Sequence, residues 1–181
     1  MGAVDVRGDE SSERTGSDRK RGDSAAGDRS LPYLLGRGAP RAPDRDSLDA
    51  WGRLLGAVLP RPVVVTLEGD LGTGKTTLAR AICAGAGVQE LGSVTSPTFS
   101  LVQQYDAPGG PVVHADLYRL RTRAELDAIG WDEIVDTAAM LLIEWPERAA
   151  SSLPRDTIAI TLSHDAADPD RRLLRVVVPA P

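Results

Sequence analysis

The residues best suited to chemistry form one glycine-rich stretch, Gly69-Asp70-Leu71-Gly72-Thr73-Gly74-Lys75-Thr76-Thr77. Its spacing fits G-x-x-x-x-G-K-[ST], the pattern of a phosphate-binding P-loop. Glycines let successive backbone N–H groups point at phosphate oxygens, and the N-terminus of a following helix adds its dipole. In such a loop Lys75 reaches the β- and γ-phosphates, Thr76 binds Mg²⁺ and Thr77 adds a phosphate contact. The stretch therefore predicts a site for a nucleoside phosphate and a magnesium ion.

The residues on either side indicate a strand before this stretch and a helix after it. Residues 63–68 are apolar and β-branched, as in a buried parallel strand. Residues 76–83 are compatible with a helix whose apolar face includes Cys83, the only cysteine of the chain. A lone cysteine excludes an internal disulfide, and free cysteines are usually buried, so we expect Cys83 in the core of a protein from a reducing compartment.

An acidic residue at the end of a neighbouring strand is needed to complete the magnesium site. Asp116 ends the predicted strand 111–116, and Glu144 ends the apolar strand 138–144. Because active-site groups of open α/β sheets gather at the carboxyl ends of strands, both carboxylates are candidates. The more hydrophobic strand before Glu144 better suits the direct neighbour of the P-loop strand. One carboxylate would ligate the metal and the other orient water, or either would only cap the next turn; which one touches the metal stays open.

Two further groups lie near these candidates in the sequence. Residues 92–100 are rich in hydroxyl groups. Either they only turn the chain, or they form a switch loop that faces the γ-phosphate and metal, with Thr98 close by. Their position after the P-loop helix favours the switch. His114 shares a strand face with Asp116, and we expect a structural, hydrogen-bonded histidine rather than a base.

Apolar periodicity and turn signals place the other elements. A helix is predicted over about residues 46–58, with Trp51 in the core rather than over an adenine base. A capping box opens a second helix over residues 122–130, and Pro146 is expected to start another.

Alternating patterns predict two antiparallel hairpins. One joins residues 101–106 to 111–116, and the other joins residues 158–162 to 172–178 near the end of the chain. Together these elements predict an α/β fold of the P-loop NTPase type. Its mostly parallel central sheet would be flanked by helices and would carry antiparallel hairpins at the edge.

Composition divides the 181-residue chain into a tail and one domain. Residues 1–43 have few apolar side chains and are predicted to be disordered, with the cluster Arg19-Lys20-Arg21 solvated rather than bound to nucleic acid. Residues 44–181 would form the P-loop ATPase domain. Charges in residues 1–46 balance, so residues 47–181 carry the whole net charge of −5. The negative charge of residues 47–181 disfavours tight binding to nucleic acid by the chain alone. It does not exclude action within a complex whose other members bind the nucleic acid.

Several absences narrow the function. The chain has no asparagine, so the guanine-reading N-K-x-D motif is absent, which indicates either ATP as the nucleotide or weak discrimination between bases. No apolar run approaches the roughly 18 residues of a membrane span, and no apolar leader follows the first residues. We therefore expect a cytoplasmic protein with no membrane partner.

Five ordered motifs resemble the TsaE (YjeE) family, the P-loop ATPases of bacterial tRNA threonylcarbamoyladenosine synthesis. They are Gly-Asp-Leu-Gly-Thr-Gly-Lys-Thr-Thr (69–77), Ser-Pro-Thr-Phe-Ser-Leu-Val (96–102), His-Ala-Asp-Leu-Tyr-Arg-Leu (114–120), Glu-Leu-Asp-Ala-Ile-Gly (125–130) and Ile-Glu-Trp-Pro-Glu (143–147). At Thr73, Phe99 and Ala115 the chain differs from the residues that are usual in the family. None of these differences removes a polar group that we assign to chemistry. The resemblance covers about residues 45–165 and says nothing about the tail.

The resemblance implies an ATPase that works with TsaD-like and TsaB-like partners on the adenosine beside the anticodon, and meets tRNA only indirectly through the complex. ATP hydrolysis would reset the partner complex between rounds. Carried over by motif, Lys75 binds phosphates, Thr76 and Glu144 hold Mg²⁺, and Asp116 supports the metal or hydrolysis. Trp145 would lie next to the nucleotide.

Two rival functions are consistent with the P-loop. One is a small-molecule kinase in which Arg119, Arg121 and Arg123 clamp a phosphoryl group, although no long insertion is present to close as a lid. The other is a binding module whose ATP state only sets its affinity for a partner. Because no arginine finger is evident in the sequence, hydrolysis by the chain alone is expected to be slow.

Overall fold

The computed structural model describes residues 31–36 and 39–179, which fold around a six-stranded sheet of order β2-β3-β4-β1-β5-β6. The strands are β1 (Val63–Glu68), β2 (Val102–Tyr105), β3 (Val112–Asp116), β4 (Met140–Glu144), β5 (Ile158–His164) and β6 (Arg172–Val177). The four central strands β3, β4, β1 and β5 run parallel, while β2 and β6 pair antiparallel at the two edges. The predicted α/β fold, with both of its hairpins, is confirmed.

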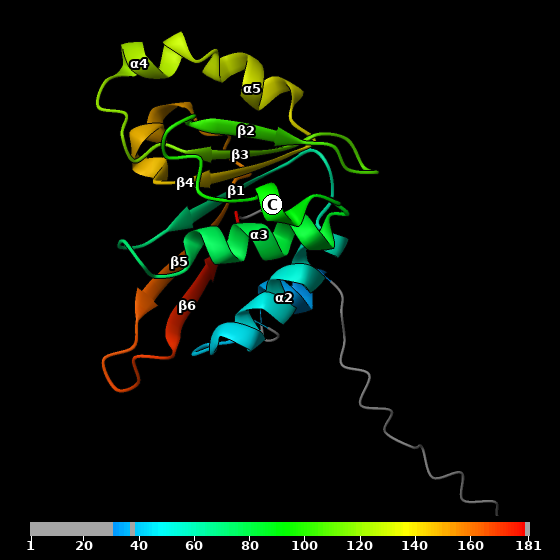
Figure 1. Cartoon of the computed structure of the whole chain (residues 1–181), viewed down its shortest axis with the longest axis vertical. Coiled ribbons are helices and arrows are strands. Elements are labelled where there is room, and N and C mark those ends of the chain that lie inside the picture. Colours follow the sequence, from blue (N-terminus) through cyan, green and yellow to red (C-terminus); the bar gives the residue numbers. More distant parts are fainter. Residues whose placement is uncertain (1–30, 37–38, 180–181) are drawn as a thin grey trace, which may run out of the picture.

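Helices cover both faces of this sheet. They are α1 (Leu31–Leu35), α2 (Arg45–Val58), α3 (Lys75–Gly85), α4 (Arg123–Ala128) and α5 (Trp131–Thr137), with short 3₁₀ turns η1 (Leu91–Ser93), η2 (Pro146–Arg148) and η3 (Ala150–Ser152). Figure 1 shows α2 and α3 on one side of the sheet and α4 and α5 on the other. The parallel strands are therefore buried on both faces, which is why β3 and β4 have no exposed residue.

Local capping explains where two of the helices begin. Asp44 is the N-cap of α2, and its carboxylate accepts a hydrogen bond from the Ser47 backbone N–H at 2.8 Å. The predicted capping box is present at α4, where Thr122 and Glu125 each accept a bond from the other's backbone N–H. Hydrogen bonds from the backbone N–H groups of Arg121 and Thr122 lower the pKa of Glu125.

Two predictions about the middle of the chain are corrected. Pro146 does not start a regular helix, because only the three-residue turns η2 and η3 follow it. Gly130 ends one helix but also serves, with φ of 72°, as the N-cap of α5, which was not predicted. The side chain of Trp131 at the start of α5 is fully buried and fixes this helix against the sheet.

The prediction of a disordered tail is wrong for its last part. Leu34 in α1 is buried, and its carbonyl accepts a hydrogen bond of 3.1 Å from the indole N–H of Trp51, a core residue as predicted. The chain then follows the edge of β6, where the Leu174 backbone N–H donates to the Arg41 carbonyl at 2.9 Å. The apolar contacts of Leu34 and this edge pairing hold the segment on the domain. Residues 1–30 lie outside the described residues.

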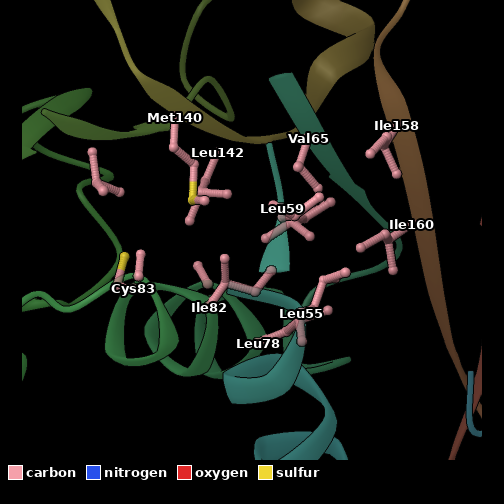
Figure 2. Close-up of a cluster of buried hydrophobic side chains, with 14 of the residues drawn as sticks. Leu55, Leu59, Val65, Leu78, Ile82, Cys83, Met140, Leu142, Ile158 and Ile160 are labelled. Atoms are coloured by element: carbon pink, nitrogen blue, oxygen red, sulfur yellow. The ribbon is translucent and has the colours of Figure 1, made fainter. Parts of the chain in front are cut away.

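The larger hydrophobic core lies between the sheet and helices α2 and α3. Figure 2 shows side chains of β1, β4 and β5 meeting those of the two helices, with Leu55, Leu78 and Ile82 among them. Cys83 belongs to this core, as predicted, and burial raises its pKa to about 12. A second cluster fills the space under α4 and α5. The α3 helix, which carries the P-loop lysine, is thus fixed by the main core.

Glycines let α2 and α3 approach each other until their backbones touch. A Cβ atom added to Gly56 of α2 would lie 2.0 Å from the carbonyl oxygen of Ile82, and one added to Gly85 of α3 would lie 1.9 Å from that of Arg53. Neither position tolerates a side chain unless one helix moves. The position of α3, and with it the P-loop, therefore depends on this glycine contact.

We expect Gly56→Ala to lower the free energy of unfolding by about 1–3 kcal/mol, because the added methyl group must push the helices apart. Urea unfolding followed by circular dichroism measures the change. Gly92→Ala is the matched control, since a Cβ there meets no atom within 4 Å. Equal stability of the two variants would contradict the close packing of α2 on α3.

Candidate nucleotide-binding site

The glycine stretch joins the end of β1 to the start of α3 in a tight loop. Gly69 and Gly74 have φ values of 135° and 101°, which residues with side chains rarely adopt. A Cβ on Gly69 would also lie 2.0 Å from the carbonyl oxygen of Leu162 on β5. Gly74 is the N-cap of α3 and has no side chain to cap it, so the first N–H groups of the helix are open to an anion.

Lys75, the first residue of α3, is folded back over this loop. Its ammonium group donates to the carbonyls of Gly69 and Asp70 at 2.8 and 2.9 Å, and lies 4.1 Å from the centroid of the Trp145 ring. Burial lowers the pKa of Lys75, while the negative charges of Glu144 and Asp116 oppose that shift. The only cation of the loop is therefore held beside two carboxylates.

Trp145 reaches this position because of an uncommon backbone conformation. It follows β4 directly and has φ of 60° and ψ of 52°, in the left-handed region. Its ring also packs against Tyr118, with centroids 4.9 Å apart. Two aromatic rings thus form one wall next to the ammonium group of Lys75.

Glu144, the last residue of β4, is a buried carboxylate held by two neighbours. Its Oε1 accepts a hydrogen bond of 2.7 Å from the Thr76 hydroxyl and lies 2.9 Å from Nε2 of His114. The strand β4 pairs directly with β1, as the sequence predicted for the strand that ends in Glu144. The first turn of α3 is thereby linked to the carboxyl ends of two strands.

Asp116, the last residue of β3, is opposite Glu144 in the parallel register of β3 and β4. Its Oδ2 accepts hydrogen bonds from the Ser96 and Thr98 hydroxyls, the latter at 2.7 Å, and its Oδ1 accepts one of 3.1 Å from the Tyr118 backbone N–H. The hydroxyl-rich segment that follows α3 therefore folds back onto the second carboxylate.

These groups surround one cavity of about 470 Å³. Its lining combines P-loop residues, the hydroxyl-rich segment and both strand ends: Leu71, Gly72, Gly74, Lys75, Thr76, Thr77, Ser96, Thr98, Asp116, Tyr118, Glu144 and Trp145. Hydroxyl and carboxylate oxygens are the ligands that Mg²⁺ prefers, and a lysine with open helix N–H groups suits phosphate. The described residues contain no group of three or more His, Cys, Asp or Glu side chains that would hold a metal without phosphate oxygens.

A second cavity of about 310 Å³ lies on the other side of the P-loop. It shares Gly72, Gly74 and Thr77 with the first cavity. Its other walls come from the P-loop residue Thr73, from the start of α2 (Asp44, Arg45 and Leu48) and from the β5–β6 hairpin (Asp170 and Arg172). The P-loop thus separates the first cavity, whose charged groups are one lysine and two carboxylates, from a second cavity lined by two carboxylates and two arginines.

Known proteins resemble this chain over most of its length. The sequence model described as "Threonylcarbamoyl adenosine biosynthesis protein TsaE" matches residues 42–173. The chain belongs to the TsaE family. The TsaE protein of Haemophilus influenzae is 37% identical over 127 residues, covering 67% of this chain and 79% of the relative. That of Treponema pallidum is 39% identical over 112 residues, covering 62% and 81%.

A solved structure with the same fold is that of YdiB from Bacillus subtilis. It aligns with a TM-score of 0.58 and 26% sequence identity, covering 75% of this chain and 82% of YdiB. The matches therefore cover the P-loop, both strand-end carboxylates and most of the sheet. The family identification made from the five sequence motifs is confirmed.

Most of the residues predicted for the site lie together in this TsaE-family chain. Two of the predicted P-loop residues do not line the first cavity. Asp70 contributes its backbone carbonyl to Lys75, and the buried Thr73 donates its hydroxyl to that same carbonyl at 2.9 Å. Ser96 lines the cavity as part of the hydroxyl-rich segment that was expected to face it, although it was not singled out, whereas Tyr118, two residues after Asp116, was not predicted. No helix in the described part of the chain is long and apolar enough to cross a membrane.

We expect the double variant Ser96→Ala, Thr98→Val to loosen the segment that covers Asp116, since the buried carboxylate loses two donors. Hydrogen exchange of the backbone amides of residues 95–101 should become faster than in the wild type. Ser100→Ala is the control, because this exposed hydroxyl has no hydrogen-bond partner within the described residues. Unchanged exchange in the double variant would contradict the role of these hydroxyls.

Proposed function

We propose that this chain binds and hydrolyses ATP with Mg²⁺ in support of threonylcarbamoyl modification of the tRNA adenosine beside the anticodon. It would act in the cytoplasm within a complex of TsaD-like and TsaB-like proteins. The TsaE family is named for threonylcarbamoyladenosine biosynthesis. The activity itself is inferred from the site.

One observation carries the proposal: a P-loop lysine, a P-loop threonine and two strand-end carboxylates line the same cavity. In the proposed complex, Lys75 leaves the loop carbonyls to bind the β- and γ-phosphates. Thr76 and Glu144 hold the magnesium ion, and Asp116 either supports the metal or orients the attacking water. Bound magnesium neutralises charge that develops on the phosphate oxygens during transfer to water.

The two cavities on either side of the P-loop suggest how the nucleotide lies. The triphosphate occupies the cavity with Lys75, and the chain of phosphates passes the N-terminus of α3. Ribose and base then extend past Thr77 into the cavity beside Asp44 and Arg172, which adjoins the same loop residues. The absence of asparagine, and so of the N-K-x-D guanine motif, favours either adenine over guanine or weak discrimination between bases.

Exposed apolar side chains near the first cavity support a protein partner. Leu71 on the P-loop is 76% exposed, Phe99 on the hydroxyl-rich segment is 89% exposed, and Tyr118 is 47% exposed. Apolar side chains gathered near a ligand site are typical of an interaction surface. Lys75 is the only basic residue among the described residues that line the cavity, so slow turnover without a partner is expected.

A small-molecule kinase is the alternative. The observation that favours it is a third cavity of about 760 Å³, which shares Tyr118 with the first and is lined by Arg119, Arg121 and Arg148. Arg123, the third arginine of the predicted clamp, is instead paired with Asp127 at 2.6 Å. Two of the three arginines thus remain candidates for a second phosphate-bearing ligand.

We expect Lys75→Ala to reduce ATP turnover at least about 100-fold, because the cation that meets the phosphates is lost. Phosphate release is measured for the wild type and variant with Mg²⁺ and with a chelator, using ATP and GTP. The wild type should release phosphate to water only when Mg²⁺ is present, and it should release phosphate faster from ATP than from GTP. Thermal unfolding checks that the variant is folded. Full turnover by the variant would contradict the site, and transfer to an acceptor would favour the kinase.

We expect the TsaD-like and TsaB-like partners to accelerate ATP turnover, and Phe99→Ser to abolish most of this acceleration without changing basal turnover. The exposed ring lies next to the site but does not line the cavity. Leu173→Ser on β6 is the matched control, because Leu173 is also exposed but lies on the opposite edge strand of the sheet. Equal acceleration of the Phe99 variant and the control would contradict a partner surface at this position.

A further inference from the structure

His114 is a fully buried polar residue in the centre of β3. It pairs in register with Gln103 on β2 and Leu142 on β4, so it lies within the sheet and two residues before the end of its strand. None of its surface is exposed. A buried imidazole in an otherwise apolar strand is costly unless it makes a specific hydrogen bond.

The one hydrogen bond of this imidazole is to Glu144. Nε2 lies 2.9 Å from Glu144 Oε1, whereas Nδ1 has no partner among the described residues. A carboxylate only accepts, so Nε2 carries the proton and donates it. The assignment follows from the hydrogen-bond network, because a proton on Nδ1 would leave a buried N–H group unpaired.

The same carboxylate oxygen also accepts the bond from Thr76, which leaves the other oxygen available. Oε1 receives both His114 and Thr76, while no described residue donates to Oε2. Glu144 lines the nucleotide cavity. Its carboxylate is therefore held at one oxygen from inside the sheet, and its second oxygen has no partner within residues 31–36 and 39–179.

We propose that His114 is a positioning residue that fixes the Glu144 carboxylate for the magnesium ion of the bound nucleotide. This inference rests on the proposed function, in which Glu144 and Thr76 serve the metal. If the Thr76 oxygen held the metal, the hydrogen bond from Thr76 to Glu144 would not by itself define the orientation of the carboxylate. The His114 bond comes from a rigid central strand and is independent of the nucleotide. Groups that orient a metal-site residue commonly change metal affinity or activity by about 10- to 100-fold when removed.

Three substitutions separate this role from simple packing. His114→Gln can place its amide nitrogen near the position of Nε2, and so keeps a donor to Glu144. His114→Asn is also an amide but is too short to reach Oε1, and His114→Leu fills space without a donor. Tyr105→Phe is the matched control, since it removes a partly buried side-chain hydrogen bond of 2.6 Å, to Gln103 on the same strand, at a strand end that lies outside the nucleotide cavity.

The experiment measures ADP binding by calorimetry with and without Mg²⁺, together with the Mg²⁺ concentration that gives half-maximal ATP turnover. The quantity compared is the factor by which Mg²⁺ raises the affinity for ADP. We expect this factor to be about tenfold or more smaller in His114→Leu and His114→Asn than in the wild type. Their half-maximal Mg²⁺ concentration should rise by a similar factor. Metal-free ADP binding should stay unchanged, and His114→Gln and Tyr105→Phe should behave like the wild type.

The experiment distinguishes a failure of the His114 positioning role from a failure of the proposed ATPase function. If the Leu and Asn variants lose only thermal stability while their Mg²⁺ dependence matches that of the wild type, the positioning role is overturned. If the Leu variant does not fold, the comparison of Asn with Gln gives the same decision. If the wild type binds ADP and Mg²⁺ without hydrolysing ATP, the proposed ATPase function fails, but the Mg²⁺-dependent gain in ADP affinity still tests His114.

Discussion

The hydrogen bonds that meet at Glu144 connect the parts of the molecule on which the site depends. The carboxylate ends β4, the Thr76 hydroxyl comes from the first turn of α3, and the His114 imidazole comes from the middle of β3. A buried carboxylate without such donors would be strongly destabilising. The sheet register and the position of α3 must therefore both be correct before this carboxylate can be buried. The parallel pairing that sets Asp116 opposite Glu144 then brings the second carboxylate to the same edge.

The position of α3 is determined by packing on its other side. The contact between α2 and α3 is close because glycine backbones replace side chains at the crossing, and because Leu55, Leu78 and Ile82 fill the space toward the sheet (Figure 2). Interiors packed at this density transmit small shifts, so a displaced α2 would move the first turn of α3. The P-loop lysine and threonine are thus positioned by residues that never meet the ligand. The N-terminal helix α1 adds to this support through the bond from Trp51 to Leu34.

Sequence patterns predicted the parts of the fold and site that depend on local chemistry. The glycine loop and the capping box at Thr122 are defined by residues close together in the chain, and the hydrophobicity of β4 correctly predicted that it pairs with β1. The contacts that were not predicted depend on chain reversals between distant residues. Ser96 meets Asp116 across twenty positions, and the left-handed backbone of Trp145 has no glycine to indicate it. The helix α1 was not expected because its apolar run, Leu31–Leu35, is only five residues long, too short to show a helical period, and follows a polar segment.

The hydroxyl-rich segment joins the candidate metal site to the outer surface of the molecule within two consecutive residues. Thr98 donates to Asp116 in the cavity, while the next residue, Phe99, projects into solvent under the guanidinium of Arg119, 5.1 Å from the ring centroid. A bound ligand shifts a conformational equilibrium only through contacts that differ between the two states. In the proposed function, Asp116 oxygens that support a magnesium ion would no longer accept the Thr98 hydroxyl in the same way. Because Phe99 follows Thr98 directly, a change in that bond would alter the surface offered to the proposed partner, so that the proposed ATP hydrolysis would be communicated without a large movement of the sheet.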